Sequence, residues 1–381
     1  MTAPVLGPAA DATAPLAEDE REELRQPVAR FLERLGAGVP AVLPDEQSRR
    51  QAWLGLAQEM DLLGIAVPAE HGGQGLSLAH TAVVSEQVGR LLLPLPYLTS
   101  ACWATAVVLH SDDGDSRTDL LSRMVTGEAV AAVAEVEESG TGELVVEGSG
   151  DECRLTGTVR FVPHGLTADV LLVVARDAAG GPASVLVVDG DAPGLRRTEL
   201  ETLDPSRPQA QVHFHATPAR RLPDSSGTAH VRARQEATVL LAAESVGGAA
   251  ECVRATADYA RSRRQFGQPI GAFQAVQHRF ADLHGEVESA RAVVEWAVTL
   301  VSAPHSDPAE LSVAAAIAGA RAGEAYATVA REAIHLHGGI GFTWEHSAHR
   351  YFKRALADRQ LLGGSGAHRR HVAAALFGDH H

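Results

Sequence analysis

A connection rich in arginine is the first place in this sequence where side chains could bind an anionic ligand. It runs from Tyr259 to Gln274 and reads YARSRRQFGQPIGAFQ. An arginine side chain presents a planar fork of donors that suits phosphate. A solvated basic turn at the C-terminus of a helix would have a similar composition. The pattern by itself therefore leaves an anion site and a plain helix end both open.

A glycine-rich segment, Ile334 to His346, is the second candidate. It reads IHLHGGIGFTWEH, with glycine at three of the four positions 338–341. Glycine lets backbone N–H groups approach a ligand closely, and such groups can hold anionic oxygen. The same glycines also suit a helix end followed by a tight turn. Both interpretations stay open at this point.

Composition and periodicity indicate the elements that must position these segments. The chain has 381 residues, 45% apolar and 21% charged, which predicts two or three globular domains. After a mobile stretch at 1–16, helices are expected from the acidic segment around 18, from about 45 to 60 and from about Ser77. Residues 1–126 are therefore predicted to be an all-helical domain.

Residues 127–226 are predicted to form a β domain. Short β-branched runs recur there about every ten residues, broken by Gly, Asp and Pro. Because no helical pattern separates the runs, an antiparallel barrel or sandwich is expected rather than a doubly wound nucleotide-binding fold.

Residues 227–381 are predicted to form a C-terminal four-helix bundle. Apolar side chains recur every three or four residues from Phe273 to Val301, as in the seam between nearly antiparallel helices. The next helix is expected to start with Asp307 as N-cap and Pro308 as its first residue, and to end at Gly338. The whole chain is thus predicted to be α+β and multidomain.

Charge and cysteine content exclude several function classes. The 33 Lys+Arg and 48 Asp+Glu give a net charge of −15, which repels nucleic acid and anionic lipid. No stretch reaches the roughly 18 apolar residues of a membrane span. Three separated cysteines favour a reducing cytoplasm over a disulfide framework. The histidines lack metal-ligand spacing, so no metal is expected, and His380-His381 are expected to be a polar tail.

The two segments, together with VPAEHGGQGLSL near residue 70, resemble the acyl-CoA dehydrogenase superfamily of flavoproteins over about residues 20–378. The resemblance implies a homo- or hetero-oligomer, a dimer of dimers, that binds FAD non-covalently. Arg263, Gln265 and Phe266 would face the FAD of a neighbouring subunit, with Arg263 toward the pyrophosphate. Further FAD contacts would come from three residues: Gln274, Gly338 and Gly339.

The resemblance also implies the reaction, α,β-dehydrogenation of an acyl thioester carried by CoA or by an acyl-carrier protein. In that reaction a carboxylate removes the α-proton and the β-hydrogen leaves as hydride to flavin N5. The implied electron acceptor is an electron-transfer flavoprotein.

The usual base is missing from the sequence. Many members carry it as Glu in a segment that corresponds here to residues 361–365, and Leu362 occupies its position. Other members carry it on the first helix of the bundle, where the counterpart is Ala237, directly after Glu236. Glu244 lies two turns further along a mostly apolar helix and could accept a proton. Its alternative role is that of a structural carboxylate paired with an arginine.

The β domain departs from the family pattern as well. Of the family's TEPxxGSD segment, the counterpart at 134–140 keeps the Glu but little else. In the strand TGTVRFVPH, Val162 falls where an aromatic often covers the flavin ring, and His164 where a hydroxyl often reaches N5. His164 could donate a hydrogen bond or move a proton, or it could be a rim histidine without a catalytic role.

Three hypotheses follow from these departures. In the first, the protein is an FAD-dependent oxidoreductase that dehydrogenates an acyl thioester with a relocated base. In the second, it is a non-catalytic or half-site subunit of a heteromeric acyl-CoA dehydrogenase, in which a homologous chain supplies the base. In the third, the flavoprotein fold serves hydroxylation or a redox-neutral rearrangement.

Overall fold

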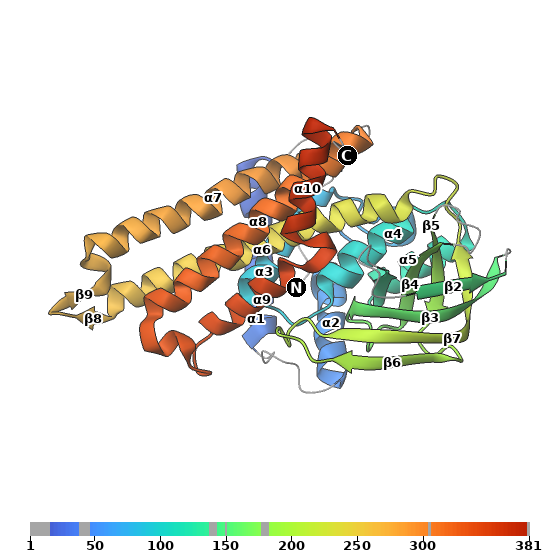
Figure 1. Ribbon diagram of the computed structural model, residues 1–381, viewed down its shortest axis with the longest axis horizontal. Coiled ribbons are helices and arrows are strands. Elements are labelled where there is room, and N and C mark those ends of the chain that lie inside the picture. The colour runs from blue at the N-terminus through green and yellow to red at the C-terminus, as the bar shows by residue number, and fades with distance from the viewer. Residues whose placement is uncertain are drawn as a thin grey trace. The chain divides into compact units, whose positions relative to one another are not determined.

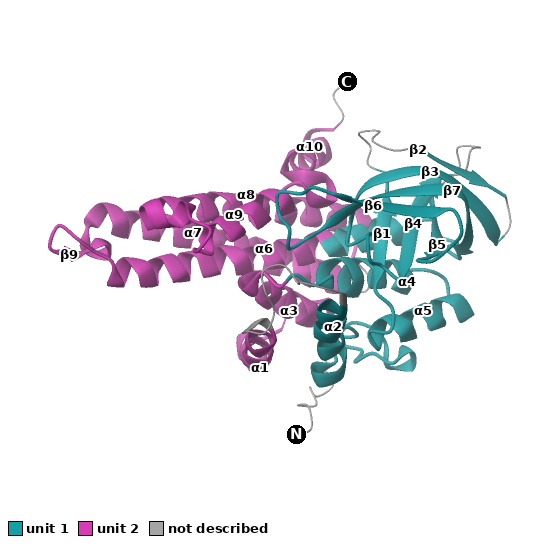
Figure 2. Cartoon of the chain, turned by 90° about the horizontal axis from the view of Figure 1, so that it is seen from below, with its two compact units in different colours: residues 1–12, 39–77, 94–237 teal, residues 13–38, 78–93, 238–381 magenta. Residues whose placement is uncertain are grey.

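The computed structural model describes residues 16–37, 46–136, 143–148, 151–176, 183–303 and 306–378. The described residues of 39–77 and 94–237 form one compact unit, and those of 13–38, 78–93 and 238–381 form a second (Figure 2). Predictions for the first fifteen residues, for residues 137–140 and for His380-His381 lie outside the described residues.

The first unit contains a curled sheet with short helices beside it (Figure 1). Its strands are β1 (Ala131–Glu135), β2 (Glu143–Glu147), β3 (Glu152–Pro163), β4 (Val170–Arg176), β5 (Ala183–Asp189), β6 (Leu195–Leu200) and β7 (Gln209–Leu222). Its helices are α2 (Glu46–Met60), a 3-10 turn (Ala69–His71), a π-helical segment (Tyr97–Ala104), α4 (Thr105–Leu109) and α5 (Asp115–Val125).

The sheet has the strand order β1-β4-β5-β7-β3-β2, and β6 pairs with β7. Every pairing between these described strands is antiparallel except that of β1 with β4, which is parallel. The predicted central β fold is confirmed, with this parallel pair as the difference from a wholly antiparallel sheet. The π-helical segment reaches β1, where Ser100 Oγ accepts a hydrogen bond of 3.0 Å from the Ala131 N–H.

The second unit is helical. It contains α1 (Glu18–Ala37), α3 (Leu78–Leu91), the greater part of α6 (Ala229–Ser262), α7 (Gln274–Ser302), α8 (Pro308–His337), α9 (Ala348–Asp358) and α10 (Gly364–Phe377). A two-residue hairpin, β8 (Arg264–Gln265) with β9 (Gln268–Pro269), and a 3-10 turn at Ile270–Ala272 join α6 to α7. Further 3-10 turns follow α8 at Gly338–Phe342 and α9 at Leu361–Gly363.

Local sequence explains where these helices begin and which faces they bury. The Oδ1 of Asp307 accepts a hydrogen bond of 3.0 Å from the Ala309 N–H, and Pro308 is the first residue of α8, as predicted. The predicted seam of α7 is buried from Leu283 onward, whereas its first apolar positions are only half-buried. That first turn of α7 follows the arginine-rich connection. Apolar side chains at this end of the second unit are therefore partly exposed.

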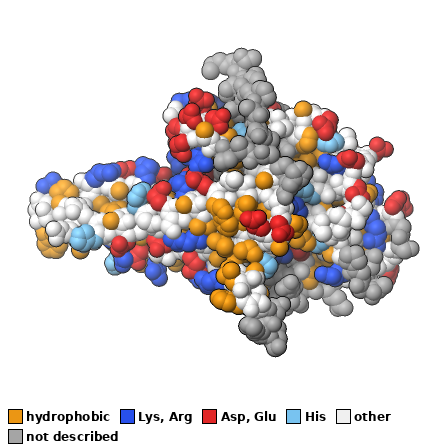
Figure 3. Space-filling view, turned by 90° about the horizontal axis from the view of Figure 1, so that it is seen from above, with side chains coloured by type: hydrophobic (Ala, Val, Ile, Leu, Met, Phe, Trp, Pro, Cys, Tyr) orange, Lys and Arg blue, Asp and Glu red, His pale blue; other side chains and the backbone are white. Residues whose placement is uncertain are grey.

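The three predicted domains, 1–126, 127–226 and 227–381, stay a prediction. The kind of element changes close to both inner boundaries: α5 ends at Val125 before β1 begins at Ala131, and β7 ends at Leu222 before α6 begins at Ala229. None of the described helices is both long and apolar enough to cross a membrane. On the face drawn in Figure 3, basic and acidic side chains are interspersed.

Candidate cofactor and acyl-thioester site

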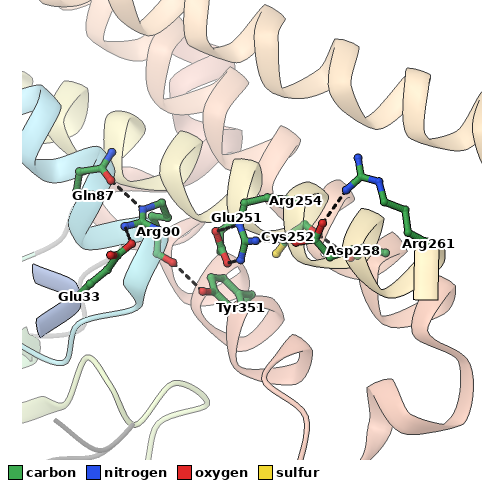
Figure 4. A network of polar contacts seen from close by, with 10 residues as sticks. Glu33, Gln87, Arg90, Glu251, Cys252, Arg254, Asp258, Arg261 and Tyr351 are labelled. Atoms are coloured by element: carbon green, nitrogen blue, oxygen red, sulfur yellow. Dashed lines mark hydrogen bonds and ion pairs between the residues drawn. The ribbon is translucent and has the colours of Figure 1, made fainter. Parts of the chain in front are cut away.

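The arginine-rich connection offers one cation that has no partner within the described residues. Arg261 donates to Asp258 at 2.6 Å, as Figure 4 shows, and the Nη2 of Arg264 donates to the Gly267 carbonyl at 3.0 Å. The Arg263 side chain is exposed and forms neither an ion pair nor a side-chain hydrogen bond in the described part of the chain. Of the three arginines, Arg263 is therefore the one that is available to an anion.

The hairpin beside Arg263 presents an unusual aromatic side chain. Phe266 stands at its turn with a positive φ of 50° and is 92% exposed. Its ring lies edge-to-face with the ring of Phe273, at a centroid distance of 6.2 Å. Gln265, its neighbour in sequence, and Gln274, the first residue of α7, are exposed as well. A phenyl ring held this far out buries almost no apolar surface within the chain, so its position suits a ligand or a second chain.

The glycine turn after α8 is open in the way that a ligand cradle requires. Gly338 has a φ of 62°, a conformation that disfavours other residues. A Cβ added at Gly338 or at Gly339 would meet nothing within 4 Å, so packing within the chain does not explain the glycine at 339. Gly341 differs, because its Cβ would lie 2.7 Å from the Ile334 carbonyl oxygen, and this packs the turn onto the end of α8.

The glycine turn and the arginine-rich connection lie near each other. The ring of Tyr259, at the end of α6, stacks on His337, the last residue of α8, with centroids 4.6 Å apart. The structure therefore brings Arg263, Gln265, Phe266, Gly338 and Gly339 to one end of the second unit. An unpaired guanidinium, amide side chains, an exposed ring and open backbone fit a flat, phosphate-bearing dinucleotide such as FAD.

The end of β3 presents an aromatic side chain next to one of the residues considered from the sequence. Val162 is 1% exposed and belongs to the apolar cluster of the sheet. The aromatic residue of the strand is its neighbour Phe161, which is 43% exposed and has a φ of 59°. An aromatic that covers a ring from this strand would therefore be Phe161. Sequence reasoning did not single out Phe161, although it is the one aromatic residue of β3, and the role of Val162 stays a prediction. His164 is buried, with its N–H donating to the Pro208 carbonyl at 2.8 Å.

The position expected to carry the base is buried and holds a leucine, Leu362. Leu362 lies in the turn between α9 and α10, is 6% exposed and has left-handed φ and ψ values of 57° and 34°. An aliphatic side chain cannot accept a proton. The turn thus has a leucine buried where the family resemblance places a glutamate.

Glu244 is held in a buried ion pair. Its Oε1 accepts a hydrogen bond of 2.6 Å from Arg354 Nη1, and both side chains are 2% exposed. The backbone of Gly89 lies against it, since a Cβ there would be 1.9 Å from the Glu244 carbonyl oxygen. This is the structural alternative considered from the sequence, a carboxylate neutralised by an arginine.

The Glu236 carboxylate also has hydrogen-bonding partners. Its Oε1 accepts from Arg232 Nε at 2.8 Å and lies 2.9 Å from His110 Nε2. The side chain is 10% exposed and belongs to the first unit, whereas Glu244 belongs to the second. The role of either residue as base stays a prediction. Among the described residues, no group of three or more His, Cys, Asp or Glu is arranged to hold a metal ion.

Comparison with known proteins decides the family. The acyl-CoA dehydrogenase N-terminal domain profile matches residues 18–128, and the C-terminal domain profile matches residues 233–377. The chain is 33% identical to acyl-CoA dehydrogenase IpdE2 of Mycolicibacterium smegmatis over 94% of its length and 99% of that protein. The chain belongs to the acyl-CoA dehydrogenase superfamily. The family resemblance and the predicted order of helical, β and helical parts are thereby confirmed.

Two solved structures of this superfamily show the same fold. A steroid acyl-CoA dehydrogenase variant described as Tcur3481-Tcur3483 is 32% identical, with a TM-score of 0.83 over 94% of this chain and 98% of the other. The ChsE4-ChsE5 complex from Mycobacterium tuberculosis is 28% identical, with a TM-score of 0.83 over 96% and 98%. Acyl-CoA dehydrogenase homologues are oxidoreductase flavoenzymes, and members of the family bind FAD.

Proposed function

We propose that this chain takes part in FAD-dependent α,β-dehydrogenation of an acyl thioester as one subunit of a heteromeric acyl-CoA dehydrogenase. In this assembly a homologous chain supplies the base. The observation that carries the proposal is the buried Leu362 at the expected base position. The two carboxylates that could have replaced the base are each held by an arginine. This choice favours the second sequence-based hypothesis while keeping the reaction of the first.

The residues of this chain would then serve binding and positioning. Arg263 would face the pyrophosphate of the FAD of a neighbouring subunit, and the open backbone at Gly338 and Gly339 would make further FAD contacts. Gln265 and Phe266 would face the FAD of that neighbouring subunit, and Gln274 would make a further FAD contact. Separately, Val162, His164 and Phe161 of the first unit are candidates for contact with the flavin ring. Bound FAD supplies the hydride acceptor of the reaction, and electron-transfer flavoprotein is the proposed next acceptor.

The names of two relatives support the heteromer and suggest a substrate. Both solved structures are described as pairs of different proteins, and one is described as a steroid acyl-CoA dehydrogenase. We therefore propose a bulky polycyclic acyl-CoA as substrate and a tetramer of two chains of each kind, acting in the cytoplasm. The leucine at 362 supports such an assembly, because a second chain must provide the proton acceptor.

Expression of the chain alone and together with a homologous acyl-CoA dehydrogenase chain tests the proposal. We expect the pair to copurify, to carry bound flavin and to reduce a dye acceptor with a steroid side-chain CoA thioester. The chain alone should show no turnover. Turnover by the chain alone that is lost in Glu244→Gln or Glu236→Gln would instead establish a relocated base. Oxygen consumption with NADH would favour the hydroxylation hypothesis.

A further inference from the structure

The first turn of α9 is capped by a histidine. Ser347 stands at the N-cap position, but its side chain forms no capping hydrogen bond. Instead, the Nδ1 of His346 accepts a hydrogen bond of 3.1 Å from the N–H of Ala348, the first residue of the helix. The first N–H groups of a helix have no partner within the helix, so this contact replaces a Ser or Asp cap. Only an imidazole without a proton on Nδ1 can form it.

The same imidazole supports the glycine turn. Its ring lies 4.2 Å from the ring of His337, which itself stacks on Tyr259. The Nδ1 of His337 donates to the Ala333 carbonyl at 2.7 Å, which fixes this ring to α8. The turn Gly338–Phe342 lies between these two histidines in sequence and begins at the fixed one. After its far end, the chain is tied to α9 by the His346 cap and by the ring of Trp344, which lies edge-on to the ring of His349 with centroids 5.0 Å apart.

A positive charge on His346 would have no compensation within the described residues. The N-terminus of α9 already carries a partial positive charge. The ring of His346 lies beside the ring of His337 from α8, and the nearby His349 from α9 is a second group that becomes cationic when it takes up a proton. The adjacent carboxylate, Glu345, is exposed and forms no ion pair in the described part of the chain. Burial lowers the pKa values of His337, His346 and His349.

The rest of α9 is anchored independently of this cap. Tyr351 Oη donates to the Arg90 carbonyl on α3 at 2.7 Å, which Figure 4 shows, and Arg354 is paired with Glu244 on α6. Loss of the cap would therefore loosen the first turn of α9 and the glycine turn before it, while the middle of the helix stays in place.

We propose that His346 is a positioning residue whose neutral imidazole holds the glycine turn in its ligand-binding form, so that mild acid releases the turn and weakens FAD binding. The identity of the ligand rests on the proposed function. The loosening of the turn does not, because it follows from the cap and the stacked rings alone.

The test compares the full chain with His346→Asn and His346→Ala at pH 7.5 and 5.5, using the heteromer wherever FAD is measured. Asparagine can cap the helix but cannot take up a proton in this range. We expect the FAD affinity of the unmodified protein to fall between the two pH values by up to about tenfold, the equivalent of losing one helix cap. The His346→Asn protein should change by less than about twofold. The exposed His284→Asn on α7 serves as control and should follow the unmodified protein.

The midpoint of thermal unfolding gives a second readout that needs no cofactor. It should fall more on acidification for the unmodified chain than for His346→Asn, and His346→Ala should be low at both pH values. Equal acid sensitivity of the unmodified and His346→Asn proteins in both readouts would overturn the proposal. If the heteromer binds no FAD at any pH, the proposed function fails, and the thermal comparison still decides the role of His346.

Discussion

Two regions of the second unit differ in how far their side chains are exposed and paired. At the end formed by the arginine-rich connection and the glycine turn, Arg263 is exposed and has no side-chain partner among the described residues, and Phe266 is 92% exposed. Where α6 meets α9, Glu244 and Arg354 are each 2% exposed and satisfy one another. Side chains of the first region are accessible to a ligand. The charged side chains of the second region are buried and pair with one another, which stabilises the fold. A subunit that binds FAD but leaves proton abstraction to another chain would show this contrast.

The largest expected loss of stability comes from breaking the buried ion pair between Glu244 and Arg354. Arg354→Ala leaves Glu244 buried without its cation, which should lower the free energy of unfolding by about 3–5 kcal/mol in urea denaturation. The double replacement Glu244→Leu with Arg354→Met removes both charges and should cost far less. A small loss for Arg354→Ala would mean that Glu244 is not bound in this pair and is free to act as a base.

A glutamate in place of Leu362 would give this chain a proton acceptor at the position where the family resemblance expects one. Because a positioned general base contributes about 10²- to 10⁴-fold to a rate, Leu362→Glu should confer flavin reduction by acyl-CoA on this chain's own site, measured as anaerobic bleaching. Leu362→Gln has a similar shape but no basic carboxylate and should stay inactive. Equal activity of the two variants would argue against position 362 as the place where a catalytic base is missing.

Removal of the free cation should weaken FAD binding without affecting the fold. Arg263→Ala is expected to lower FAD affinity by about 10- to 100-fold, since a hydrogen bond to a charged group contributes about 1.5–3 kcal/mol. Fluorescence titration of FAD into the apo heteromer measures the change. Arg261→Ala is the matched control, because that arginine is already paired with Asp258. Equal losses in the two variants would contradict the assignment of Arg263.

The smallest expected effect on stability belongs to the exposed ring. Phe266→Ala should change the free energy of unfolding of the isolated chain by less than about 0.5 kcal/mol, because the ring contacts little within the chain. Copurification with the partner chain should nevertheless fall. A large loss of stability in the isolated chain would show that the ring packs internally after all.

Much of the fold could be predicted from local sequence. The periodic seam of α7, the Asp307 cap and the succession of β-branched runs are local patterns, and each predicts an element whose main features the structure shows. The parallel pairing of β1 with β4 was not predicted, because it joins strands 39 residues apart in register, such as Ala131 and Val170. Pairing between distant strands leaves no local signal in composition.

The candidate site was only partly predictable for the same reason. The sequence by itself determined that Leu362 replaces the expected glutamate and that glycines and arginines follow the two long helices. Only the tertiary structure decided that Glu244 meets an arginine 110 residues away and that Phe161 rather than Val162 is exposed. It also decided that Arg263, unlike Arg261 and Arg264, has no side-chain partner among the described residues. Residue type and spacing state which chemistry is available, whereas burial and ion pairing depend on contacts between segments far apart in the chain.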